Sequence, residues 1–148
     1  MTDRDAAATA LVAITAHLGL VRDANVQPGE VVFVHGGAFV RGDKNVSDGG
    51  YGNILLWFAR QGYLGINMEY RLAPEATYPG GADDIARAVE WLKKASSDYG
   101  GDPERMFLFG HSAGGTHVAT YAYDPAPGYL GRGIKGIALV SARLRADV

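Results

Sequence analysis

The sequence predicts an α/β fold with a doubly wound, mostly parallel sheet. Short apolar runs that are typical of buried strands alternate along the chain with segments of helical periodicity. Such alternation indicates right-handed β–α–β units, whose strands run parallel. In sheets of this kind ligands bind beyond the carboxyl ends of the strands, so the residues that follow each strand are the candidates for a functional site.

Spacing and turn residues predict the individual elements. Helical patterns cover residues 3–18, the segment from Tyr51 to Gly62, residues 79–98 and the segment after Ser112. The pattern over 79–98 is the strongest, because Ile85, Val89 and Leu92 share one face. The predicted strands are 31–34, 63–70, 106–109 and 137–140, and the predicted loops are 41–50, 71–78 and 124–133.

Length and composition bound the class of protein. The 148 residues predict one domain over 1–148, with 47% apolar and 20% charged residues. A net charge of −2 gives no reason to expect nucleic acid or a membrane surface as a partner. The chain has no cysteine, which excludes disulfides and thiolate chemistry. No signal peptide or membrane span is visible, so we expect a cytoplasmic protein.

A serine turn carries the main chemical signal. Residues 110–115 read GHSAGG and lie between a predicted strand and a predicted helix. The glycines indicate a turn too tight for side chains, with Ser112 held in a strained backbone and its hydroxyl exposed. This is the geometry of a serine nucleophile.

Backbone N–H groups near this turn are candidate oxyanion donors. One donor is the N–H of Ala113, the residue after the nucleophile at the start of a helix. The others come from Gly36 and Gly37 after the strand at 31–34, where the backbone itself must approach a substrate carbonyl. The expected site is therefore Ser112 with an oxyanion hole made by Gly36, Gly37 and Ala113.

Three motifs together resemble one family. They read HGGAF at 35–39 with Gly42 and Asp43 behind, YRLAPE at 70–75 and GHSAGG at 110–115. In this order and spacing they resemble the α/β-hydrolase esterases of the hormone-sensitive-lipase and carboxylesterase type. The resemblance covers about 31–141. It does not include 1–28, where the family has two strands and this chain has a helical pattern and a turn.

The resemblance implies a Ser–Asp–His triad with the acid and the histidine after the serine, and the sequence departs from it. After Ser112 the only histidine is His117, and it precedes the acids Asp124 and Asp147. Five residues along a helix rotate His117 by roughly 140° from Ser112. The chain therefore resembles the front part of the fold, truncated after the strand that follows the nucleophile helix.

The remaining candidate residues have structural interpretations. We expect His35 to hold the oxyanion loop, His111 to pack or line the pocket, His117 to face the core or a loop, and His17 to lie on the surface. Arg71 and Asp84 are expected to form a salt bridge that braces the loop with Pro74. No metal-ligand spacing, nucleotide-binding glycine motif or cofactor signature is present.

Two functions from different classes remain open. The first is a serine hydrolase that acts on small carboxylic esters with short acyl chains, or as an arylformamidase on N-formyl amides. The second is a catalytically incomplete fragment, or half of a split enzyme. Its exposed sheet edges would favour self-association or a C-terminal partner chain.

Overall fold

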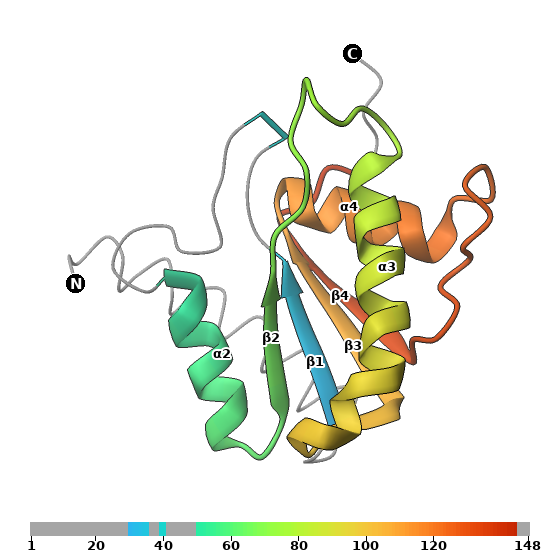
Figure 1. The fold of residues 1–148 in the computed structure, drawn as a ribbon. Coiled ribbons are helices and arrows are strands. Elements are labelled where there is room, and N and C mark those ends of the chain that lie inside the picture. Colours follow the sequence, from blue (N-terminus) through green and yellow to red (C-terminus); the bar gives the residue numbers. More distant parts are fainter. Residues whose placement is uncertain (1–29, 36–38, 41–49, 145–148) are drawn as a thin grey trace.

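The computed structural model describes residues 30–35, 39–40 and 50–144. The predicted helix over 3–18 lies outside this part of the chain. So does the predicted loop over 41–50, except for Gly50, which is the first residue of a helix. Within it, four strands form one sheet in the order β2-β1-β3-β4, and every neighbouring pair is parallel. The strands are β1 (Glu30–His35), β2 (Leu64–Met68), β3 (Asp102–His111) and β4 (Gly136–Val140). The predicted parallel α/β sheet is confirmed (Figure 1).

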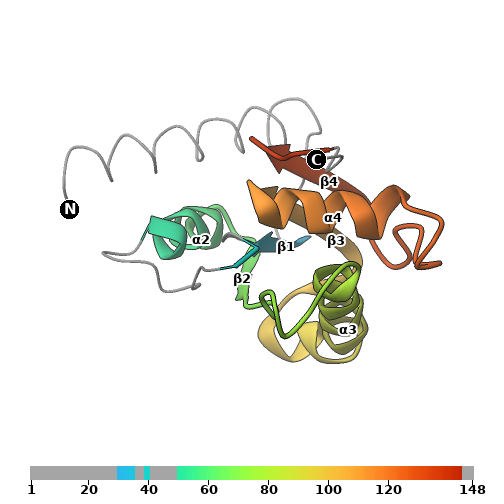
Figure 2. The same cartoon turned by 90° about the horizontal axis from the view of Figure 1, so that it is seen from above.

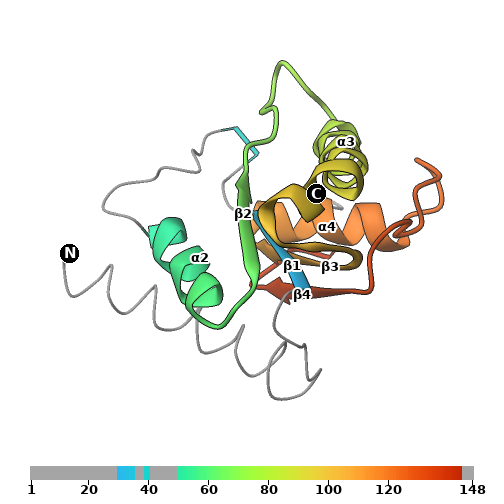
Figure 3. The same cartoon turned by 60° about the horizontal axis from the view of Figure 1, so that its bottom comes forward.

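Helices cover both faces of the sheet, as Figures 1 and 3 show. The helix α2 (Gly50–Arg60) lies on one face, and α3 (Gly80–Ala95) and α4 (Ala113–Tyr123) lie on the other. Seen from above, α3 and α4 lie side by side (Figure 2). Among the described residues, no helix combines the length and the apolar character that crossing a bilayer requires.

Alternation along the strands divides the core into two parts. In β3, Met106 and Leu108 pack with α3 and α4, while Phe109 packs with Ile54 and Phe58 of α2. Both faces of β3 are therefore apolar, as expected for a parallel sheet covered by helices on each side.

The strand β3 begins earlier than the sequence predicts. Asp102 pairs with Glu30, and the next pair along is Met106 with Val31, so residues 103–105 bulge out of the ladder. Pro103 has no N–H to donate to a neighbouring strand, and this explains why the sequence places the start of the strand at Met106. The prediction of a strand over 106–109 is correct for the regular part.

The helix predicted over 79–98 ends sooner, at Ala95. A 3₁₀ turn, η2 (Ser96–Tyr99), follows it, and Gly100 adopts a left-handed conformation with φ of 80°. The N–H of Gly100 reaches back to the turn, which ends the helix as a glycine C-cap does. The chain then enters β3.

Candidate active site

The carboxyl ends of the strands meet at one edge of the sheet. His35 at the end of β1 pairs with Met68 of β2 and with Gly110 of β3, and His111 pairs with Val140 at the end of β4. Tyr70 and Arg71 follow β2, and Ser112 follows β3. The three predicted motifs therefore leave their strands at the same edge.

Ser112 lies in a strained turn between β3 and α4. Its φ of 54° and ψ of −124° fall in a region that residues with side chains rarely adopt, and the residue is exposed. Its own N–H donates to the carbonyl of Val140 at 2.9 Å. The predicted strain is present, and it directs the residue outward from the end of the sheet.

Two glycines allow α4 to begin directly over the end of β3. A Cβ at Gly110 would lie 2.6 Å from Cα of Gly115, and a Cβ at Gly115 would lie 2.6 Å from Cβ of Ala142. The tight contact therefore joins Gly110 to Gly115, the second glycine after the serine. Thr116 also donates its hydroxyl to the carbonyl of Arg143 at 2.6 Å, which holds the segment after β4 against the start of α4.

The predicted oxyanion donors are described only in part. Ala113 is the first residue of α4, and the first N–H groups of a helix have no partner within it. The N–H of Ser112 is bonded to Val140 of β4, so the N–H of Ala113 is the next along the chain. Gly36 and Gly37 lie outside the described residues, as does the side chain of His35.

His111 packs beside the turn, as the sequence predicts. Its Nδ1 lies 3.1 Å from the hydroxyl of Tyr51, the second residue of α2, and the two rings are 6.0 Å apart. Burial lowers the pKa of His111, because a charged imidazole loses its hydration there. The sequence does not reveal that Tyr51 contacts His111, because the two residues are 60 positions apart.

His117 lies on α4 and faces the core and the segments after β1 and β2. Its ring contacts Phe39 and Tyr70, which agrees with the predicted rotation away from Ser112. Burial lowers the pKa of His117, and the charge of Asp84 opposes that shift. Burial also raises the pKa of Tyr70 to about 12, with further contributions from Tyr51 and Glu69.

The predicted salt bridge between Arg71 and Asp84 is present. Nη2 of Arg71 lies 2.8 Å from Oδ1 of Asp84, Nε donates to the same oxygen at 2.9 Å, and the backbone N–H of Arg71 donates to Oδ2 at 2.9 Å. Burial by itself would raise the pKa of Asp84, but the hydrogen bonds and charge of Arg71, helped by Arg87, lower it overall. The pair attaches the loop after β2 to α3.

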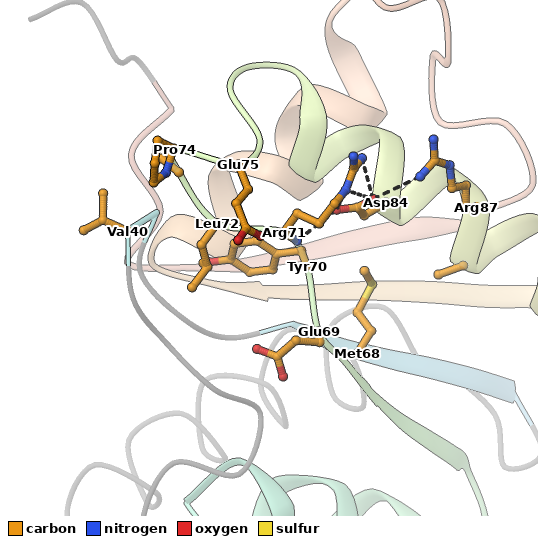
Figure 4. Close-up of a pocket in the computed structure, with 12 residues that line it drawn as sticks. Val40, Met68, Glu69, Tyr70, Arg71, Leu72, Pro74, Glu75, Asp84 and Arg87 are labelled. Carbon is orange, nitrogen blue, oxygen red and sulfur yellow. Dashed lines mark hydrogen bonds and ion pairs between the residues drawn. The ribbon is translucent and has the colours of Figure 1, made fainter.

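An open pocket of about 700 Å³ lies beside this salt bridge rather than at the serine (Figure 4). Leu72, Pro74 and Val40 line one part of it, and Arg71 and Arg87 converge on Asp84 in another. Ser112 is not among its lining residues, so the pocket does not mark the predicted nucleophile. Over residues 30–35, 39–40 and 50–144, no cluster of three or more His, Asp or Glu is arranged to hold a metal ion.

A strained serine between a parallel strand and a helix, at the carboxyl edge of a doubly wound sheet, is typical of the α/β-hydrolases. Comparisons with known proteins agree. The BD-FAE family profile matches residues 21–125. The carboxylesterase NlhH of Mycobacterium tuberculosis is 36% identical over 97 residues, which are 62% of this chain and 28% of NlhH.

Solved structures give the same result. Esterase B from Lactobacillus rhamnosis superposes with a TM-score of 0.61 at 28% identity, over 80% of this chain and 39% of that one. A bacterial heroin esterase superposes with a TM-score of 0.54 at 34% identity, over 66% of this chain and 30% of that one. The chain thus spans well under half the length of these relatives. It belongs to the BD-FAE family, among the α/β-hydrolase esterases of hormone-sensitive-lipase type.

Proposed function

We propose that Ser112 is the nucleophile of a carboxylic ester hydrolase that acts on esters with short acyl chains. The observation that carries this proposal is the strained, exposed Ser112 at the start of α4, in a chain of an esterase family. Its Oγ would attack the ester carbonyl and lose its proton to a base. The C–O bond would then break, the alcohol would leave with that proton, and water would hydrolyse the acyl-enzyme.

The negative oxygen of the tetrahedral intermediate would accept hydrogen bonds from the N–H groups of Gly36, Gly37 and Ala113. These donors would be backbone groups already oriented before reaction, which stabilises developing charge without reorganisation. The position of Ala113 at a helix N-terminus supports its part, because the helix dipole favours negative charge there. An N-formyl aryl amide could enter the same site, and this makes an arylformamidase the alternative within the class.

The second candidate function is that of an incomplete hydrolase that needs further polypeptide for its base. Tyr51 lies against His111, and Phe39 and Tyr70 lie against His117, so both described histidine rings are packed among aromatic groups. In the described sheet β4 pairs only with β3, and β2 only with β1. The edge of β4 that pairs with no strand in the described part of the chain is suited to strand addition, by a second copy or by a partner that carries the histidine and the acid.

Labelling and turnover test both candidates. The chain and its Ser112→Ala variant are treated with a fluorophosphonate probe, with p-nitrophenyl esters of increasing acyl length and with an N-formyl aryl amide. Turnover that requires Ser112 and declines with acyl length supports the complete hydrolase. Faster turnover of the amide than of the esters supports the formamidase. If the Ser112→Ala variant keeps both labelling and turnover, Ser112 is not the nucleophile.

Light scattering after size exclusion tests the second candidate. An incomplete hydrolase is supported if labelling is weak and the chain forms a dimer. It is equally supported if labelling is weak and the chain forms a complex with added C-terminal polypeptide of a relative. A sharp monomer that turns over esters by itself contradicts it.

A further inference from the structure

The imidazole of His117 joins three segments from different parts of the chain. Its ring centre lies 5.3 Å from that of Phe39 at an interplanar angle of 85°, and 4.7 Å from that of Tyr70 at 69°. Both are edge-to-face arrangements, which the charge distribution of aromatic rings favours. Phe39 follows β1 and Tyr70 follows β2, while His117 belongs to the helix that starts directly after Ser112.

The backbone of α3 closes another side of the ring. Gly81 is buried, and a Cβ at this position would overlap the imidazole of His117, with Cδ2 only 2.6 Å away. Glycine is therefore the residue that lets α3 approach so closely. The ring occupies a slot between Gly81, Tyr70 and Phe39, which leaves it little freedom to move.

Phe39 is held from a second direction by the loop after β2. The backbone N–H of Ala73 donates to the carbonyl of Phe39 at 2.8 Å. Phe39 is 39% exposed, and its ring contacts the imidazole of His117. Phe39 lies two residues after Gly37, and His117 lies four residues after Ala113 on one helix.

We propose that His117 is a positioning residue, which holds Phe39, in the segment after β1, against α4 near its start. This inference rests on the proposed function. In the proposed function, the oxyanion donors would come from the residues that precede Phe39 and from the start of α4. His117 belongs to α4, and its ring contacts Phe39. Oxyanion donors act only when they lie at hydrogen-bond distance from the developing charge, so a small displacement between the segments slows acylation strongly.

The first experiment does not depend on activity. Hydrogen exchange is measured for peptides that cover residues 36–40, in the wild type, in His117→Ala and in Tyr123→Ala. Tyr123 is a matched control, because it is an aromatic residue of the same helix that is 70% exposed. We expect exchange at 36–40 to become about tenfold faster in His117→Ala and to stay unchanged in Tyr123→Ala. Unchanged exchange in His117→Ala would overturn the proposal.

The second experiment is a double-mutant cycle on the rate at which Ser112 reacts with a fluorophosphonate. If His117 acts through Phe39, His117→Ala and Phe39→Ala each slow labelling about tenfold, and the double variant is no slower than the slower single one. If His117 only fills space, the two effects multiply to about a hundredfold, and the inference is wrong.

Two further arms keep the outcome decisive. If His117→Ala does not fold, His117→Leu replaces it, because leucine fills most of the volume without a ring edge. If the wild type shows no labelling that depends on Ser112, the proposed function fails, and hydrogen exchange alone decides whether His117 positions Phe39.

Discussion

The turn at 110–115 and the loop at 71–79 lie at the same edge of the sheet but are fixed by different means. Backbone contacts shape the turn, where Gly110 meets Gly115 with no room for a side chain. Side chains fix the loop, mainly through Arg71 and Asp84. Asp84 is 13% exposed and Arg71 is 46% exposed, so water shares in this pair.

This difference predicts how each region tolerates change. A backbone contact has no flexible group that can move aside, so any added atom displaces a strand or a helix. A half-exposed ion pair can weaken gradually, because water replaces the lost hydrogen bonds. The part that carries the proposed nucleophile should therefore be the least tolerant part of the described fold.

The largest effect is expected for Gly110→Ala. Its new Cβ would lie 2.6 Å from the backbone of Gly115, and we expect the free energy of unfolding to fall by about 3 kcal/mol or more. Gly52→Ala is the control, because a Cβ at Gly52 meets nothing within 4 Å; there α2 should gain up to about 1 kcal/mol. Urea unfolding measures both, and similar values for the two variants would show that the turn is not tightly packed.

A smaller effect is expected for Asp84→Asn. The amide keeps the shape but removes the charge that Arg71 faces, and because Arg71 is half exposed we expect a loss of about 1 kcal/mol. Glu75→Gln changes a carboxylate of the same loop and should stay within about 0.5 kcal/mol of the wild type. A loss in Asp84→Asn as large as that in Gly110→Ala would remove the distinction between the two regions.

The smallest effect is expected from mild acid. The pKa values of His111 and His117 lie below the ordinary 6.5, so the unfolded chain binds more protons than the folded one near and below that pH. The contribution of these two histidines to the free energy of unfolding is present above pH 6.5 and is lost as the pH falls. The midpoint of urea unfolding should therefore decrease from pH 7 to pH 5.

The loop should respond only in stronger acid. The pKa of Asp84 is lowered from 3.8, so its contribution to stability is fully present above that value and is lost as the pH falls from there through the lower pKa of the folded state. In the milder range, from pH 7 to pH 5, His117→Leu should reduce the decrease of the urea midpoint with falling pH. An equally steep dependence in that variant would mean that His117 does not titrate with unfolding.

Much of this fold could be predicted from the sequence. The apolar runs around Phe33, Leu108 and Leu139 correspond to strands in the parallel sheet, and the stripe of Ile85, Val89 and Leu92 corresponds to the buried face of α3. Periodicity is a local property, so one sequence suffices to see it. The sequence does not show the start of β3, because the single pair of Asp102 with Glu30 lies beyond a bulge.

The candidate site divides in the same way. GHSAGG predicted the strained turn, and the opposite charges of Arg71 and Asp84 suggested their pairing. The slot around His117 could not be predicted, because Phe39, Tyr70, Gly81 and His117 are far apart in the chain and no local pattern relates them.

The sequence by itself determined the succession of strands and helices along the chain and the place of Ser112 at the end of a strand. Turn chemistry and hydrophobic periodicity act between near neighbours, so both are visible in the sequence. The tertiary structure alone decided that Gly110 meets Gly115 and that the ring of His117 lies between Gly81 and Phe39. Those contacts form only when α3, α4 and the segments after β1 and β2 pack together, since close packing couples residues that the chain keeps apart.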